Sequence, residues 1–97
     1  MGRVVENAVG AHLLNHLFEP TWQTTYWREG EQEVDFVVTQ GNEVWALEVK
    51  SGRPGRCSGL AAFRARYPRS HTLLIGSQGI PLDEFFKHSP DTFLQTS

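Results

Sequence analysis

The sequence contains little cysteine and no long apolar run, and each shortage excludes a class of protein. Cys57 is the single cysteine, so no internal disulfide can form, and it lacks the paired spacing of a zinc site. A chain without disulfides is typical of a reducing compartment, so we expect a cytoplasmic protein. No stretch approaches the run of about 18 apolar residues that spans a membrane, and no signal-peptide pattern opens the chain. With 97 residues, the chain is expected to form one compact domain that makes no membrane contact.

Acidic residues are missing from segment 50–69, although it carries six of the nine basic residues. Its basic members are Lys50, Arg53, Arg56, Arg64, Arg66 and Arg69. Six acidic residues lie between positions 29 and 48, directly before it. A basic segment beside an acidic one suits an enzyme that acts on nucleic acid, because cations bind phosphates and carboxylates bind metal ions. A solvated basic helix is the alternative interpretation.

Hydrophobic periodicity predicts an α/β fold in the order α-β-β-β-α-β, a mixed sheet flanked by helices. Helices are expected at 4–18 and 58–67, with one or two helical turns at 82–87. Strands are expected at 21–28, 33–39, 44–50 and 72–76. The first helix is apolar on most sides and should be largely buried. The second is expected to bury Leu60, Ala61, Phe63 and Tyr67, while the tail from Ser89 is expected to be irregular, with Phe93 and Leu94 docking.

A hairpin with its turn at Gly41-Asn42 sets the register of the second and third strands. Gly41 stands where a type II′ turn requires positive φ. This turn places Asp35 opposite Glu48 and Glu33 opposite Lys50. The other face then carries an apolar set that must be core, since a slip of one residue would expose all of it. That set is Val34, Phe36, Val38, Trp45, Leu47 and Val49.

Asp35 and Glu48 become directly opposed carboxylates in this register, with Cβ atoms roughly 5 Å apart. Like charges at that separation repel, so a cation or a shared proton is expected between them. Hard carboxylate oxygens suit Mg²⁺ or Mn²⁺. Lys50 points to the same face as Glu48 because strand side chains alternate. The alternative is an exposed polar face, balanced by Lys50 and nearby arginines.

Glu6 and a histidine pair are further candidates on the first helix. Glu6 lies within the apolar stripe, and a buried carboxylate needs a metal, hydrogen bonds or a cation. The alternative places Glu6 in solvent near the helix N-terminus, where its charge suits the helix dipole. His12 and His16 are spaced i, i+4 and could share a metal. No HExxH motif or third ligand accompanies them, so hydrogen-bonded or exposed histidines are the simpler interpretation.

Three segments resemble the C-terminal domain, of unknown function, of a bacterial and archaeal family of AAA+ type ATPases: GRVVENAVGAHLL, YWREGEQEVDFVV and VWALEVKSG. That domain is similar to the PD-(D/E)XK, or restriction-endonuclease-like, superfamily, and Holliday-junction resolvases share its layout. The resemblance is strongest from Gly2 to Gly52 and implies a restriction-endonuclease-like fold for residues 1–97. It also implies an ATPase domain in a longer protein, from which this domain was excised. No GxxxxGK[ST] phosphate loop is present, so the chain itself cannot be that ATPase.

The resemblance implies a metal-dependent hydrolysis of phosphodiester bonds, in DNA more than in RNA. Its catalytic residues would be Asp35, Glu48 and Lys50. Its ligands for Mg²⁺ or Mn²⁺ would be Asp35, Glu48, the Val49 carbonyl and Glu6. Its nucleic-acid contacts would be Ser51, Arg53, Arg56, Arg64 and Arg66. Val34 stands where the motif has proline, a departure that leaves the metal ligands untouched.

Two other functions remain open at this point. The domain could bind nucleic acid without cleaving it, or it could mediate protein interaction or dimerisation for the ATPase. The complete set of Glu6, Asp35, Glu48 and Lys50 favours the nuclease, because a decayed site usually loses one member. A homodimer is a further expectation, since resolvase-like relatives often pair.

Overall fold

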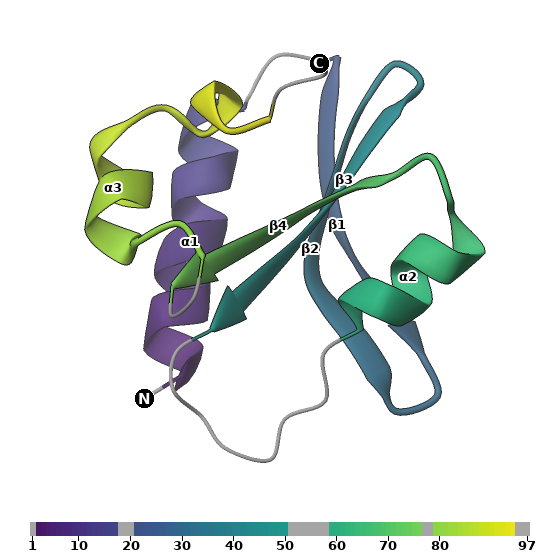
Figure 1. The fold of residues 1–97 in the computed structure, drawn as a ribbon. Helices are drawn as coiled ribbons and strands as arrows, with labels where there is room; N and C mark the ends of the chain where they lie inside the picture. The colour runs from purple at the N-terminus through teal and green to yellow at the C-terminus, as the bar shows by residue number, and fades with distance from the viewer. Residues whose placement is uncertain (1, 18–20, 51–58, 77–78, 95–97) are drawn as a thin grey trace.

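The computed structural model describes residues 2–17, 21–50, 59–76 and 79–94, which form one four-stranded sheet with helices on both faces (Figure 1). The predicted α/β class, a mixed sheet flanked by helices, is confirmed. Among these residues, no helix is long and apolar enough to cross a membrane. The elements are α1 (Gly2–His16), β1 (Trp22–Glu29), β2 (Gln32–Gln40), β3 (Glu43–Lys50), α2 (Leu60–Arg66), β4 (His71–Gly76), α3 (Leu82–Lys87) and a 3₁₀ turn, η1 (Pro90–Thr92).

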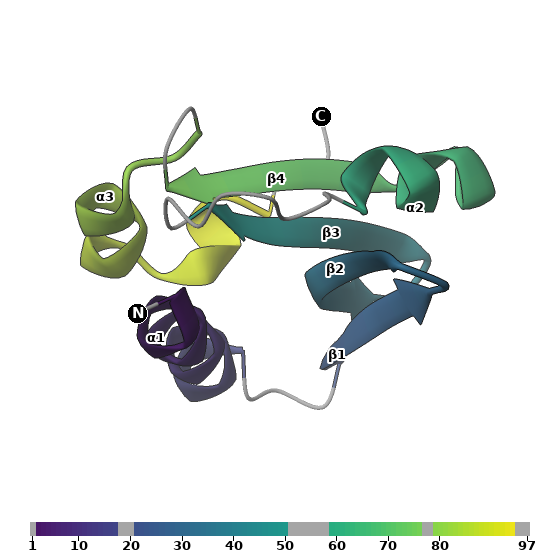
Figure 2. The same cartoon turned by 90° about the horizontal axis from the view of Figure 1, so that it is seen from below.

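The strands follow one another across the sheet in the order β1-β2-β3-β4. The first three are antiparallel neighbours, whereas β4 runs parallel to β3 after the connection through α2. Figures 1 and 2 show α1 and α3 on one side of the twisted sheet and α2 on the other. Both faces are therefore covered, and the apolar side chains of the strands divide into two clusters.

The larger cluster lies between the sheet, α1 and the C-terminal elements. The predicted stripe of α1 supplies Val9, Leu13 and Leu17, which are all buried, and the tail docks through Leu94 as expected. The rest of α1 is not buried: Ala8 and Ala11 are exposed, and Leu14 is 62% exposed. The expectation of burial on most sides was wrong, because α3 and η1 cover only one flank of the helix. The cluster is completed by Val38, Trp45, Leu47, Val49, Ile75 and Phe85.

The smaller cluster lies under α2 and joins Phe63 to Val34, Val37 and Ala46. Of the predicted inner face of α2, Phe63 is buried and Leu60 is half-buried. Ala61 is exposed and Tyr67 is 44% exposed, so these two predictions were wrong. Helix α2 has only seven residues, and its single buried side chain, Phe63, is enough to anchor it on the sheet.

The predicted hairpin register is confirmed from the turn as far as Phe36 and Leu47, which form the last pair of β2 with β3. Gly41 has φ 60°, as the turn requires. The predicted pairs beyond this point, Asp35 with Glu48 and Val34 with Val49, are not part of the ladder.

Val34 was predicted on the face of Phe36 and Val38, but it packs with Val37 on the α2 side. The cause is a shift in the pairing of β2 with β1. Thr25 pairs with Val37, whereas Trp27 pairs with Val34. One residue of β1 therefore faces two of β2, Asp35 and Phe36, which form a β-bulge.

The two histidines of α1 make hydrogen bonds to backbone carbonyls, and His12 connects the helix to the C-terminal region. Nε2 of His12 donates a hydrogen bond to the carbonyl of His88 at 2.7 Å, and the His12 ring packs edge-on against Phe85 and Phe86. Nδ1 of His16 donates to the carbonyl of His12 at 2.9 Å. Each ring thus has a structural role, which favours the interpretation of hydrogen-bonded histidines.

Candidate functional site

Asp35 is displaced from its predicted position by the bulge in which it lies. A bulge re-aims the side chains of its two residues and interrupts the ladder. Phe36 turns toward α1, where the position of a Cβ on Gly10 would be 3.0 Å from the ring. The Asp35 carboxylate enters the seam between β2 and β3, and its Oδ2 accepts the backbone N–H of Val49 at 2.7 Å. A carboxylate therefore occupies the place of a backbone carbonyl in the ladder.

This hydrogen bond gives Asp35 a structural role that can be measured. Val49 is 1% exposed, so its N–H cannot turn to water when the carboxylate is removed. We expect Asp35→Ala to lower the free energy of unfolding by about 1–3 kcal/mol. Asp35→Asn keeps an oxygen acceptor and should cost much less. Chemical denaturation of both variants checks this, and equal losses would contradict the role of the hydrogen bond.

Strands β2 and β3 separate beyond Asp35, which leaves a fork at this end of the sheet. The carbonyl of Glu33 was predicted to lie in a pair with Lys50, but it accepts the N–H of Gly59 at 2.9 Å. A Cβ on Gly59 would meet that carbonyl oxygen at 2.3 Å, so only glycine permits this approach. Gly59, which directly precedes α2, thus pairs with β2 where β3 no longer does. The fork is defined here by Asp35, Val49 and Gly59.

Glu48 is the one buried carboxylate among the described residues, and its side chain is 1% exposed. It lies on β3 between Leu47 and Val49, which both face α1, so alternation directs it to the α2 side with Ala46. Burying a charged carboxylate costs free energy unless hydrogen bonds, a cation or a metal compensate. A fold that keeps Glu48 here therefore provides such compensation.

Lys50 ends β3 on the same face as Glu48, by the same alternation, and is half-buried. Its backbone lies beside Gly76 of β4, and a Cβ on Gly76 would meet the Lys50 carbonyl at 2.1 Å. Gly76 also has φ 106°, which side-chain-bearing residues rarely adopt. The close contact fixes the end of β3 against the end of β4.

The backbone of Val49 offers an oxygen to the same fork. The N–H and C=O of one strand residue point to the same neighbour, because a paired residue exchanges both groups with its partner. The Val49 N–H points to Asp35, so its carbonyl is directed toward β2 as well. Carboxylate and carbonyl oxygens together are the donor set that Mg²⁺ and Mn²⁺ prefer.

Glu6 approaches this region from α1. Gly10 contacts Phe36, and Glu6 precedes Gly10 by four residues, so both lie on one face of the helix, roughly 6 Å apart along its axis. Glu6 is half-buried, which agrees with its place in the apolar stripe. Within residues 2–17, 21–50, 59–76 and 79–94, no three His, Cys, Asp or Glu side chains already form a group that could hold a metal.

Predicted phosphate contacts fall in two regions. Ser51, Arg53 and Arg56 lie outside the described residues. Arg64 and Arg66 are exposed on α2. Arg66 contacts Glu29 of β1 at 3.6 Å, in an exposed ion pair that contributes little to stability.

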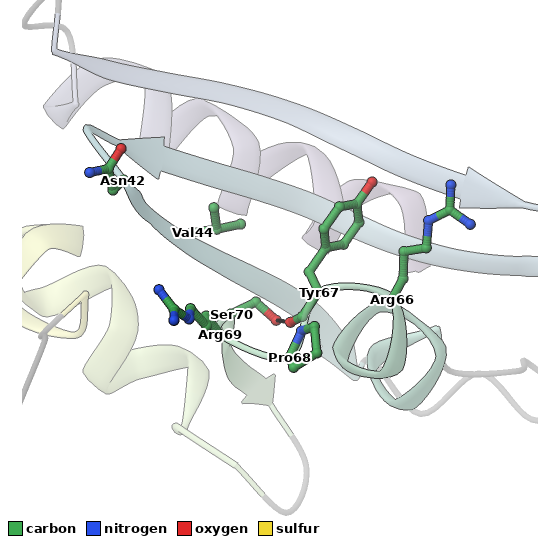
Figure 3. A pocket seen from close by; sticks show the side chains of 7 residues that line it. All are labelled: Asn42, Val44, Arg66, Tyr67, Pro68, Arg69 and Ser70. Carbon is green, nitrogen blue, oxygen red and sulfur yellow. Dashed lines mark hydrogen bonds between the residues drawn. The ribbon is translucent and has the colours of Figure 1, made fainter.

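Two pockets, one beside Asp35 and one beside Arg66, were not foreseen from the sequence. One, of about 350 Å³, lies between α1 and β1 and brings Asp35 together with Tyr26. The other, of about 390 Å³, lies at the far end of the sheet, where Arg69 and Tyr67 stand over Val44 (Figure 3). Tyr67 was assigned to the core from helical spacing. Its place directly before Pro68, where a helix must end, was the signal against that assignment.

Comparison with known proteins gives a family but no activity. No curated protein matches the chain. A crystal structure of an XisH family protein from Nostoc punctiforme PCC 73102 is similar, with 17% sequence identity and a TM-score of 0.42. The alignment covers 86% of this chain and 84% of that one. The family profile described as "Domain of unknown function (DUF4143)" matches residues 1–88, and the chain therefore belongs to this family.

Proposed function

We propose that this domain is a PD-(D/E)XK-type nuclease that hydrolyses phosphodiester bonds in DNA with the help of Mg²⁺ or Mn²⁺. The observation that carries the proposal is the fork, where the Asp35 carboxylate enters the seam beside the buried Glu48 and the backbone of Val49. These groups supply hard oxygen donors from two neighbouring strands. A cation held by them would also offset the cost of burying Glu48.

Each residue has a role in the proposed reaction. Asp35, Glu48 and the Val49 carbonyl would hold the metal at the fork, and Glu6 would reach it from α1, on the other side of the sheet from Glu48. The metal, when bound, acidifies a water and stabilises charge on the scissile phosphate. Lys50 orients the attacking water or stabilises the developing negative charge. Arg64 and Arg66 bind phosphates without reading sequence. We further propose that the domain serves an ATPase domain.

Metal binding can be tested without any assay of cleavage. We expect Mn²⁺ to raise the melting temperature of the wild-type domain, because a ligand that binds only the native state stabilises it. At a hundredfold excess over Kd the gain is about 2.7 kcal/mol, or roughly 10–20 °C for a domain of this size. Thermal-shift measurements over a range of Mn²⁺ concentrations check this.

The matched controls are Asp35→Asn and Glu48→Gln, which keep the shape of each side chain and remove its charge. Both should lose most of the shift with Mn²⁺. A shift of wild-type size in both variants would place the ion elsewhere and contradict the proposed site.

A second candidate function is nucleic-acid binding without cleavage. It is favoured by one observation: Asp35 already holds the Val49 N–H, so this carboxylate has a structural use that needs no metal. Three measurements on the wild-type domain distinguish the two functions. A wild-type domain that binds DNA, shows no shift with Mn²⁺ and leaves DNA intact would support the second.

A further inference from the structure

A groove lined by aromatic side chains runs over the sheet on the α2 side, away from the fork. It consists of two adjoining pockets, of about 390 and 280 Å³, which share Val44 and Tyr67. Trp27 of β1 lies at one end of this aromatic groove, and Arg69 lies at the other. Figure 3 shows Tyr67 and Arg69 on two sides of Val44.

The rings of the groove are partly held and partly free to make contacts. Trp27 packs edge-on against Phe63 at 5.4 Å, and Phe63 contacts the Tyr67 ring at 4.8 Å. Tyr67 is nevertheless 44% exposed. The inner rings thus support Tyr67, which remains accessible to a ligand.

The rim of the groove is positively charged near Tyr67. Arg66 and Arg69 flank this tyrosine, and no acidic side chain of the described residues forms an ion pair with Arg69. Two carboxylates lie nearby, but each has a cationic or titratable partner: Glu29 contacts Arg66, and Glu43 contacts His71 at 2.9 Å. Arg69 is therefore a cation of the groove that pairs with no carboxylate of the described residues, and it lies beside the exposed ring of Tyr67.

We propose that the aromatic groove binds a single strand of nucleic acid, with a base stacked on Tyr67 and phosphates bound by Arg69. Exposed aromatic rings next to arginines are the arrangement by which proteins bind unpaired strands without reading their sequence. In a duplex, neighbouring base pairs stack on one another and cover the faces of the bases that an aromatic ring would contact. The inference rests on the proposed function in its choice of nucleic acid as the ligand.

The groove lies apart from the fork. Val44 and Glu48 share one face of β3, and four residues of strand separate them by roughly 13 Å. Helix α2 packs on Ala46 between them. A strand held in the groove thus leaves the carboxylates at the fork uncovered, and binding in the groove needs no metal.

The test is the affinity of the 97-residue chain for a fluorescein-labelled 15-nucleotide thymidine strand, measured by fluorescence anisotropy in EDTA. We expect Tyr67→Ala to weaken binding about tenfold, whereas Tyr67→Phe keeps the ring and should bind as the wild type does. Arg69→Ala should weaken binding and reduce its dependence on salt concentration by about one phosphate contact. The same change of charge in Lys87→Ala, on α3, should have little effect.

Three outcomes would contradict the proposal. The first is that Tyr67→Ala binds the strand as tightly as the wild type does. The second is that a blunt duplex binds as tightly as the single strand and that Tyr67→Ala does not change its affinity, and the third is that poly-glutamate displaces the strand as strongly as the unlabelled thymidine strand does. The last outcome would assign the groove to acidic peptides. The two proposals can therefore fail separately. Loss of the groove proposal would appear in strand binding without metal, whereas loss of the nuclease proposal would appear only in the cleavage of DNA.

Discussion

Glu48→Gln is expected to reduce Mg²⁺-dependent DNA cleavage at least a hundredfold while the domain stays folded. Gln has the shape of Glu and fits the same buried position, but it lacks the negative charge that would hold the metal in the proposed site. Lys50→Ala should cause a loss of about 10²–10³ in rate, because it removes a charge that acts on the developing phosphate charge. Nicking of supercoiled plasmid, followed over time by gel electrophoresis, measures both effects.

The chain offers matched controls for these two variants. Glu43→Gln changes the same residue type on the same strand, but Glu43 lies at the other end of β3 and contacts His71. Lys87→Ala removes an exposed lysine of α3, which lies on the side of the sheet opposite to α2. Both controls should cleave as the wild type does. Cleavage that persists at the wild-type rate in Glu48→Gln and in Lys50→Ala would overturn the proposed mechanism, since it would come from another site.

Gly76→Ala is expected to destabilise the domain more than any other substitution that adds one methyl group to the sheet. The methyl group would lie 2.1 Å from the Lys50 carbonyl, and φ 106° is strained for alanine. Backbone strain contributes about 1–3 kcal/mol and the steric overlap about 1–3 kcal/mol more. That sum is a large share of the 5–15 kcal/mol typical of a whole domain.

Gly41→Ala is the control for strain without overlap. Gly41 also has positive φ, 60°, yet nothing lies within 4 Å of a Cβ there. It should therefore cost only about 1 kcal/mol. Urea denaturation compares the two variants. Equal losses would show that the contact between Gly76 and Lys50 is not tight in solution. A larger loss in Gly76→Ala, with the loss of Mn²⁺ binding, would link this contact to the fork.

Much of the fold could be predicted because local signals agreed with the global arrangement. The turn at Gly41-Asn42 and the apolar side chains that it pairs on one face, such as Val38 with Trp45, favour one register. That register is found from the turn to the pair of Phe36 and Leu47. The stripe of α1 similarly requires a single buried side. Such patterns are set by solvent exposure, which is recorded directly in the order of residues.

The fork could not be predicted, because it arises from competition between distant segments. The rule of alternation assumes an unbroken strand, whereas the bulge at Asp35 and Phe36 breaks it and moves Val34 to the other face. The bulge brings Phe36 against Gly10, and Gly59 takes the place beside Glu33. Neither contact has a signature in the hairpin itself. The residues of the candidate site were identified from the sequence, but their mutual geometry was not.

The hydrogen bond from Val49 to Asp35 changes how relatives of this domain should be compared. Natural selection for a stable fold is enough to retain Asp35, because without it the buried N–H of Val49 has no acceptor and the free energy of unfolding falls. A relative that has lost all activity can therefore still carry this aspartate. Lys50 ends a strand and its side chain is only half-buried, so stability places a weaker demand on it. Under the proposed function, the lysine is thus the better residue by which to distinguish active relatives from inactive ones.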